Sequence, residues 1–124
     1  MDTNLLTKTA NAMVASGKGI LAIDESHSTC KKRFDAYDIE CSEESRRAYR
    51  ELLITAPGIE KFLSGMILFD ETMRQKTDTG VPLPKVLMDN GILPGIKVDA
   101  GPHELALHPG EKVTEGLDGL RKRL

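Results

Sequence analysis

Three short, mainly apolar runs recur along the chain, and the same two residue types flank each of them. A glycine opens each run and an aspartate follows it: Gly19–Ile23 before Asp24, Gly65–Phe69 before Asp70, and Gly95–Val98 before Asp99. Short runs of consecutive apolar residues are typical of strands that are buried on both faces, as in parallel sheets. The pattern therefore predicts three buried parallel strands with an acidic residue at the carboxyl end of each.

Helical patterns fill the intervals between these runs. Residues 4–16 carry apolar side chains at helical spacing, and Ser42 is a suitable N-cap for a second helix that stops at Pro57. Shorter helices are expected over residues 71–76 and 84–90, the latter beginning at a proline, which the first helical turn accepts. Strands that alternate with helices predict an α/β fold with a parallel sheet.

The last quarter of the chain is less regular. Asp99 to Thr114 is predicted to be a long loop after the third strand, and long loops in this position are often functional. Leu117, Leu120 and Leu124 then repeat at helical spacing up to the last residue. The sequence is therefore expected to end inside a helix.

Composition argues against several classes of partner. The 17 basic and 19 acidic residues leave a net charge of -2, so no field of one sign favours nucleic acid or an anionic membrane. The apolar runs are too short to span a bilayer, and no signal peptide is visible. Cys30 and Cys41 lack Cys-x-x-Cys spacing, so free thiols in a reducing cytoplasm are expected. The three histidines lack metal-ligand spacing, and no metal is predicted.

Lys97 is the least ordinary residue of the predicted strands. It lies between Ile96 and Val98, and because side chains alternate along a strand, Lys97 and Asp99 share a face. A buried ammonium needs a partner, and Asp24 and Asp99 are the candidates. An exposed lysine on an edge strand is the alternative.

The other chemical candidates lie just after the first two strands. Asp24 can hold a lysine or orient a substrate hydroxyl, or it can cap a turn, whereas Asp70 is predicted to be a helix N-cap. Hydroxyls and cations that suit phosphate oxygens follow Asp24: Ser26, Ser28, Thr29, Lys31, Lys32 and Arg33. A solvated basic helix start is the alternative. These residues alone indicate a sugar or phosphate site but no reaction.

Five segments, in order and spacing, resemble the class I fructose-bisphosphate aldolases. Residues 17–26, 65–72 and 95–99 resemble the first three barrel strands of that family, and residues 46–53 and 115–120 resemble two of its helices. Residues 28–33 and 108–111 are closer to bacterial members than to vertebrate ones.

The resemblance implies the N-terminal portion of a (β/α)8 TIM barrel that is not closed. Residues 1–124 would form a single partial domain with an N-terminal helix and the first three strand–helix units. The implied activity is reversible cleavage of fructose 1,6-bisphosphate to dihydroxyacetone phosphate and glyceraldehyde 3-phosphate in glycolysis. A lysine forms a Schiff base in this family, so the resemblance implies no cofactor. It also implies a phosphorylated sugar substrate and a cytoplasmic homotetramer.

The resemblance also assigns roles residue by residue. Asp24 matches the strand-one aspartate that handles substrate hydroxyls, and Lys97 matches an active-site lysine on strand three. Arg46 matches an arginine assigned to substrate binding, with a structural ion pair as the alternative. Four residues match the segment that meets the sugar and its C6 phosphate, the last being the phosphate-binding arginine: Ser26, Thr29, Lys32 and Arg33.

The Schiff-base lysine of the family lies on its sixth strand and the acid/base glutamate on its fifth. Neither is expected within residues 1–124, and Lys97 is not expected to be the nucleophile. One alternative is therefore a non-catalytic truncated product that at most binds phosphates or associates with full-length subunits. A different Schiff-base barrel, such as a transaldolase-like protein, is the other alternative, and the five matching segments argue against it.

Overall fold

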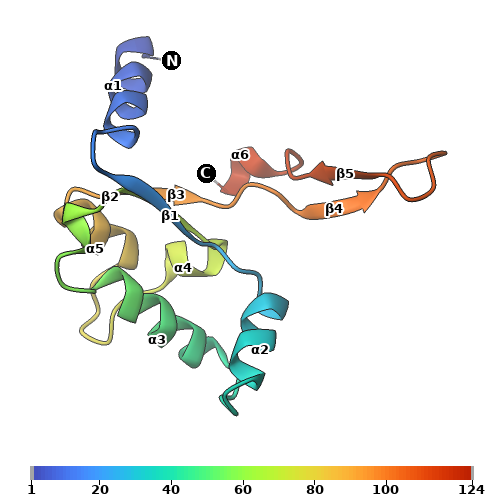
Figure 1. Cartoon of the computed structure of the whole chain (residues 1–124), viewed down its shortest axis with the longest axis horizontal. Helices are drawn as coiled ribbons and strands as arrows, with labels where there is room; N and C mark the ends of the chain where they lie inside the picture. Colours follow the sequence, from blue (N-terminus) through green and yellow to red (C-terminus); the bar gives the residue numbers. More distant parts are fainter. Residues whose placement is uncertain (1, 124) are drawn as a thin grey trace.

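The computed structural model describes residues 2–123 and has an α/β fold (Figure 1). Strands β1 (Gly19–Ile23), β2 (Leu63–Leu68) and β3 (Leu93–Ile96) form a parallel sheet in the order β1-β2-β3. The α/β class and the three parallel strands predicted from the sequence are confirmed. The sheet is open, since β1 and β3 each pair on one side only within the part of the chain described.

Helices connect the strands and cover one face of the sheet. In Figure 1, α3, α4 and α5 lie on one side of the sheet, and α1 projects from one end of it. The helices are α1 (Thr3–Met13), α2 (His27–Asp35), α3 (Glu43–Ile54), the 3-10 turn η1 (Ile59–Lys61), α4 (Asp70–Arg74), α5 (Leu83–Asp89) and α6 (Leu120–Arg123).

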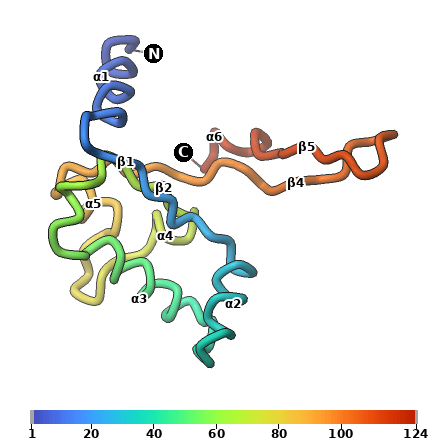
Figure 2. The backbone as a smooth tube through the Cα atoms, viewed as in Figure 1, coloured from blue at the N-terminus to red at the C-terminus, as the bar shows by residue number. Residues whose placement is uncertain are grey.

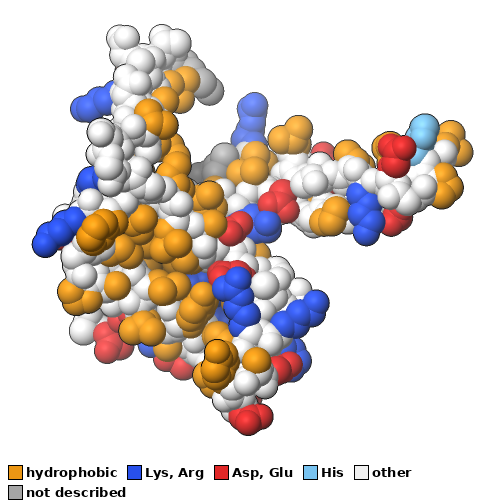
Figure 3. Space-filling view, in the orientation of Figure 1, with side chains coloured by type: hydrophobic (Ala, Val, Ile, Leu, Met, Phe, Trp, Pro, Cys, Tyr) orange, Lys and Arg blue, Asp and Glu red, His pale blue; other side chains and the backbone are white. Residues whose placement is uncertain are grey.

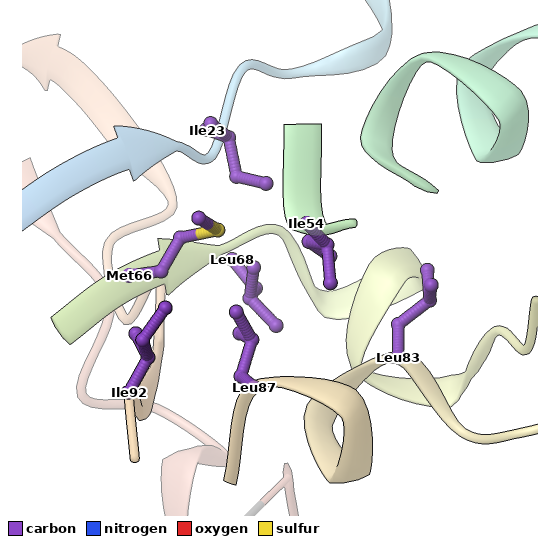
Figure 4. Packing of buried hydrophobic residues seen from close by; sticks show 7 residues of the cluster. All are labelled: Ile23, Ile54, Met66, Leu68, Leu83, Leu87 and Ile92. Carbon is purple, nitrogen blue, oxygen red and sulfur yellow. The ribbon is translucent and has the colours of Figure 1, made fainter. Parts of the chain in front are cut away.

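The core lies between the sheet and these helices. Its seven buried residues come from β1, β2, α3, α5 and the turn before β3: Ile23, Ile54, Met66, Leu68, Leu83, Leu87 and Ile92 (Figure 4). On β1, Leu21 and Ile23 face this core, whereas Ile20 is 44% exposed and Ala22 is also exposed. The prediction of burial on both faces is therefore wrong for β1, because among residues 2–123 the helices pack against one face of this strand.

The start of α3 agrees with its local sequence signal, whereas the start of α4 differs from the predicted one. Ser42 is the N-cap of α3, where its hydroxyl and that of Ser45 form a capping box. The predicted N-cap role of Asp70 is wrong, because Phe69 occupies that position and Asp70 is the first residue of α4. A carboxylate is favourable there too, since it lies in the positive first turn of the helix, and it also pairs with Arg74.

The segment after β3 differs most from the prediction. Instead of a simple loop, β4 (Gly101–Glu104) and β5 (Lys112–Glu115) pair as an antiparallel hairpin. Figure 2 shows this hairpin extending away from the sheet as an arm. The helix predicted over Leu117 to Leu124 is shorter, since α6 begins at Leu120 and Leu117 is exposed. Leu124 lies outside the described residues.

Candidate active site

Lys97 lies directly after β3, at the carboxyl ends of the parallel strands. Its backbone N–H donates to the Leu68 carbonyl at 2.8 Å, so the ladder continues one residue past Ile96, the last residue of β3. The predicted mid-strand position of Lys97 is corrected to the strand end. The side chain stands beside both candidate partners, with Nζ 2.5 Å from Oδ2 of Asp99 and 3.6 Å from Oδ2 of Asp24.

The two carboxylates stabilise the charged form of Lys97. The hydrogen bond to Asp99 raises the pKa of the Lys97 ammonium above its ordinary value, and the charge of Asp24 adds to this effect. The same hydrogen bond holds the pKa of Asp99 below its ordinary value. The site therefore presents a fixed cation that is flanked by hydrogen-bond acceptors at neutral pH.

A cavity of roughly 630 Å³ opens beside Lys97. Its lining comes from the starts of α2 and α4, the segment between β3 and β4, the start of β4 and the end of α6: Ser26, Phe69, Asp70, Lys97, Asp99, Ala100, Gly101, Pro102 and Arg123. In parallel βα folds of the barrel type, substrates are bound and transformed at this end of the strands. The cavity is therefore the candidate substrate site.

The start of α2 supplies hydroxyl groups at the edge of this cavity. Ser26 is the N-cap of α2, and its Oγ accepts a hydrogen bond from the backbone N–H of Thr29. The Ser26 hydroxyl also lies 3.0 Å from that of Ser28 and 3.2 Å from that of Thr29. Hydroxyls and free N–H groups at a helix N-terminus can bind an anion such as a phosphate.

Lys32 and Arg33 lie farther along α2 and line a different cavity, together with Phe34 and Tyr49. Arg33 forms an ion pair with Glu25, and its Nη1 lies 3.4 Å from the Tyr49 hydroxyl. The structure thus separates the predicted site residues into two groups. It brings Asp24, Ser26 and Lys97 to one site, keeps Thr29 in contact with Ser26, and holds Lys32 and Arg33 apart.

The Arg46 side chain forms hydrogen bonds to other residues of the protein. Its guanidinium donates two hydrogen bonds to the Glu71 carboxylate, at 2.7 and 2.9 Å, and a third to the Cys41 carbonyl at 3.3 Å. Nε2 of His27 lies 3.3 Å from the same carboxylate. This is the geometry of a structural ion pair, while a role in substrate binding stays a prediction.

Several residues that shape the site were not found from the sequence. Arg123 donates to the Lys97 carbonyl at 2.7 Å and to the Val98 carbonyl at 3.2 Å. Glu25 pairs with Arg33 and with the buried Arg50. The only available signal was a second acidic residue beside Asp24, because the partners lie far apart along the chain.

Two further properties bear on the kind of site. Among residues 2–123, no three His, Cys, Asp or Glu side chains are grouped so that they could hold a metal ion. The same residues contain no helix with the length and apolar character needed to cross a membrane.

Together, the fold and the site define an α/β protein whose polar side chains gather at the carboxyl ends of parallel strands, as in (β/α) barrel enzymes. The family model "Glycolytic: Fructose-bisphosphate aldolase class-I" matches residues 5–124. The chain therefore belongs to the class I fructose-bisphosphate aldolase family.

Similar proteins agree with this assignment. The chain is 63% identical over 124 residues to a "Probable fructose-bisphosphate aldolase class 1" of Xylella fastidiosa (strain 9a5c), covering 100% of this chain and 37% of that protein. It is 52% identical over 118 residues to "Fructose-bisphosphate aldolase 7, cytosolic" of Arabidopsis thaliana, covering 95% of this chain and 33% of that protein. The chain thus spans about a third of the length of these relatives.

A solved structure has the same fold. It is a ternary co-crystal structure of fructose-bisphosphate aldolase from Plasmodium falciparum in complex with TRAP and a small molecule inhibitor. The TM-score is 0.92 at 49% sequence identity, and the match covers 97% of this chain and 35% of that chain. The open three-stranded sheet therefore corresponds to part of the aldolase fold.

Proposed function

We propose that the full-length protein cleaves fructose 1,6-bisphosphate reversibly to dihydroxyacetone phosphate and glyceraldehyde 3-phosphate, through a Schiff base. The observation that carries this proposal is the Lys97 ammonium held between Asp24 and Asp99 at the strand ends, in a chain of this family. The ammonium can donate to one substrate oxygen, while the carboxylate beside it accepts from a neighbouring hydroxyl. A polyhydroxylated ketose phosphate offers both kinds of group.

Lys97 acts in this proposal as a fixed charge. A lysine that attacks a carbonyl carbon must be a neutral amine, and lysine nucleophiles have lowered pKa values. The pKa of Lys97 is raised instead, because Asp99 and Asp24 stabilise its charged form. We therefore assign the Schiff base to a lysine outside residues 1–124, as the family resemblance implies, and the acid/base glutamate likewise.

The start of α2 is the proposed site for the C6 phosphate. Ser26 and Thr29 offer hydroxyls there, and Lys32 and Arg33 add positive charge one to two turns farther along the helix. The Arg33 side chain is 55% exposed, although it pairs with Glu25, so its guanidinium is accessible to a phosphate. In this proposal Arg46 supports the substrate site indirectly, through its ion pair with Glu71.

Steady-state kinetics of the full-length protein test the assignment. Lys97→Met and Arg33→Ala each remove a charge-assisted hydrogen bond to substrate, so kcat/KM for fructose 1,6-bisphosphate is expected to fall roughly tenfold to hundredfold. Lys85→Met is the matched control, because Lys85 is exposed on α5 and pairs with Asp89. Unchanged kinetics in both site variants would reject the site.

We infer that residues 1–124 form a partial domain that is inactive by itself. The open sheet edges and the coverage of 37% of the Xylella relative support this inference. The same polypeptide could then only bind phosphates or associate with full-length subunits. For the full-length protein we propose a homotetramer in the cytoplasm, from the family resemblance and the cytosolic Arabidopsis relative. Sedimentation velocity would measure the oligomeric state directly.

A further inference from the structure

Arg50 of α3 is a buried arginine that forms hydrogen bonds to the backbone on both sides of Asp24. Its side chain is 1% exposed. Nε donates to the Ile23 carbonyl at 2.7 Å, and Nη2 donates to the Glu25 carbonyl at 2.8 Å. Those two carbonyls belong to the residues that flank Asp24, so one guanidinium spans the peptide groups around the candidate catalytic carboxylate.

The remaining donors of Arg50 extend this connection to α2. Nη2 also lies 3.3 Å from Oε2 of Glu25, and Nη1 lies 3.4 Å from the buried Cys30 thiol. A buried cation is costly unless nearly all its donors are paired, and here each guanidinium nitrogen has a partner. The planar fork of an arginine can reach several acceptors at once, whereas a lysine presents a single nitrogen.

We propose that Arg50 is a positioning residue for Asp24. It fixes the end of β1 so that the Asp24 carboxylate points at Lys97, and it sets where α2 begins. The effect on cleavage rests on the proposed function, while the effect on the position of Asp24 does not. Displacing a reacting group by about 1 Å can lower a rate roughly a hundredfold, so a small change at this buried site has a measurable effect.

Arg50→Lys in the full-length protein is the primary test. The variant keeps the charge, but its single nitrogen cannot replace the two guanidinium nitrogens that reach the two carbonyls. We therefore expect kcat on fructose 1,6-bisphosphate to fall roughly tenfold to hundredfold with little change in KM. Arg47→Lys is the matched control on the same helix, because Arg47 pairs with Glu44 and Glu51. The control is expected to keep the wild-type kcat.

A crystal structure of the Arg50→Lys variant would show the position of Asp24 independently of any cleavage assay. The separation of 3.6 Å between Lys97 Nζ and Asp24 Oδ2 is expected to lengthen. Arg50→Met, which removes the charge at similar side-chain length, is the second variant if the lysine variant does not fold, and the same changes are expected.

The outcomes separate this inference from the proposed function. A wild-type protein that does not cleave the bisphosphate refutes the proposed function, and the separation between Asp24 and Lys97 in the variant still decides the role of Arg50. An unchanged separation, a wild-type kcat, or equal losses in the Arg50 and Arg47 variants would overturn the inference. Failure of both Arg50 variants to fold would overturn it too, because the residue would then serve only to stabilise the fold.

Discussion

At the residue scale, the Arg46–Glu71 ion pair leads to a prediction of how the stability of the folded protein changes with pH. Hydrogen bonds from Arg46 hold the pKa of Glu71 below its ordinary value of 4.5, with a smaller contribution from His27. A carboxylate whose pKa is lowered by folding stabilises the protein fully above the ordinary value, and that stabilisation is lost as pH falls through the folded value. The contribution of Glu71 should therefore begin to decline below about pH 4.5 and be lost completely at a lower pH, below the folded pKa.

Melting curves of the full-length protein between about pH 6 and pH 3 measure this effect. The Tm of the wild type is expected to fall more steeply with acid than that of Glu71→Gln, which has no carboxylate to protonate. Asp89→Asn is the control, because Asp89 pairs with Lys85 on an exposed surface where an ion pair contributes little. Parallel curves for the wild type and Glu71→Gln would contradict the assignment.

The heart of the candidate site could be predicted from single residues. Alternation predicts that Lys97 and Asp99 share a face, and the parallel direction of β1, β2 and β3 brings Asp24 to the same end of the sheet. The three side chains meet there as the pattern indicates. Arg50 and Arg123 could not be predicted in the same way. They reach strand-end carbonyls that lie 27 and 26 residues away along the chain, and no local pattern encodes such a contact.

At the scale of elements, Gly116 directly follows the hairpin strand β5 and packs closely against the backbone beside the candidate site. Its φ is +154°, and a Cβ there would lie 2.5 Å from the Val98 carbonyl oxygen and 2.6 Å from the Asp99 Cα. Gly116→Ala in the full-length protein must therefore shift the backbone beside Lys97. We expect a lower Tm and a lower kcat, measured by calorimetry and by the cleavage assay.

Gly110→Ala is the matched control for this substitution. Gly110 also has a positive φ, +86°, but a Cβ there meets no atom within 4 Å. The backbone strain of about 1–3 kcal/mol is common to both variants, whereas the clash occurs only at Gly116. Equal Tm and kcat in the two variants would show that the contact with Val98 and Asp99 does not matter.

Elements with a strong local signal were the predictable ones. Apolar runs gave the three parallel strands, and the serine at position 42 marked the start of α3. The hairpin was missed because the glycine and proline residues at positions 101, 102, 109 and 110 look like loop residues, and its strands are only four residues long. Side chains of β5 are all exposed, so no buried face produced an alternating pattern.

At the scale of the whole molecule, the isolated polypeptide 1–124 has unpaired strand edges. The outer strands β1 and β3 each have one open side among the described residues, and Ile20 on β1 is 44% exposed. Figure 3 shows hydrophobic side chains gathered over the body of the molecule below α1. A barrel of this class closes with eight strands and about 250 residues, so three strands leave these groups uncovered.

We therefore expect residues 1–124 alone to self-associate or to melt without a sharp transition, because open apolar edges promote pairing between chains. Size-exclusion chromatography with light scattering, followed by thermal melting, measures both properties. A monomer with a sharp cooperative transition would show instead that these residues form a self-sufficient domain.

The most direct test of the central claim is covalent trapping with sodium borohydride. The full-length protein and residues 1–124 are each incubated with dihydroxyacetone phosphate, reduced, and mapped by peptide mass spectrometry, with substrate omitted as the control. Reduction converts an imine between lysine and the ketone to a stable secondary amine. We predict one adduct in the full-length protein, on a lysine outside residues 1–124, and none in the short polypeptide. Absence of an adduct in the full-length protein, or an adduct on Lys97, would contradict the account.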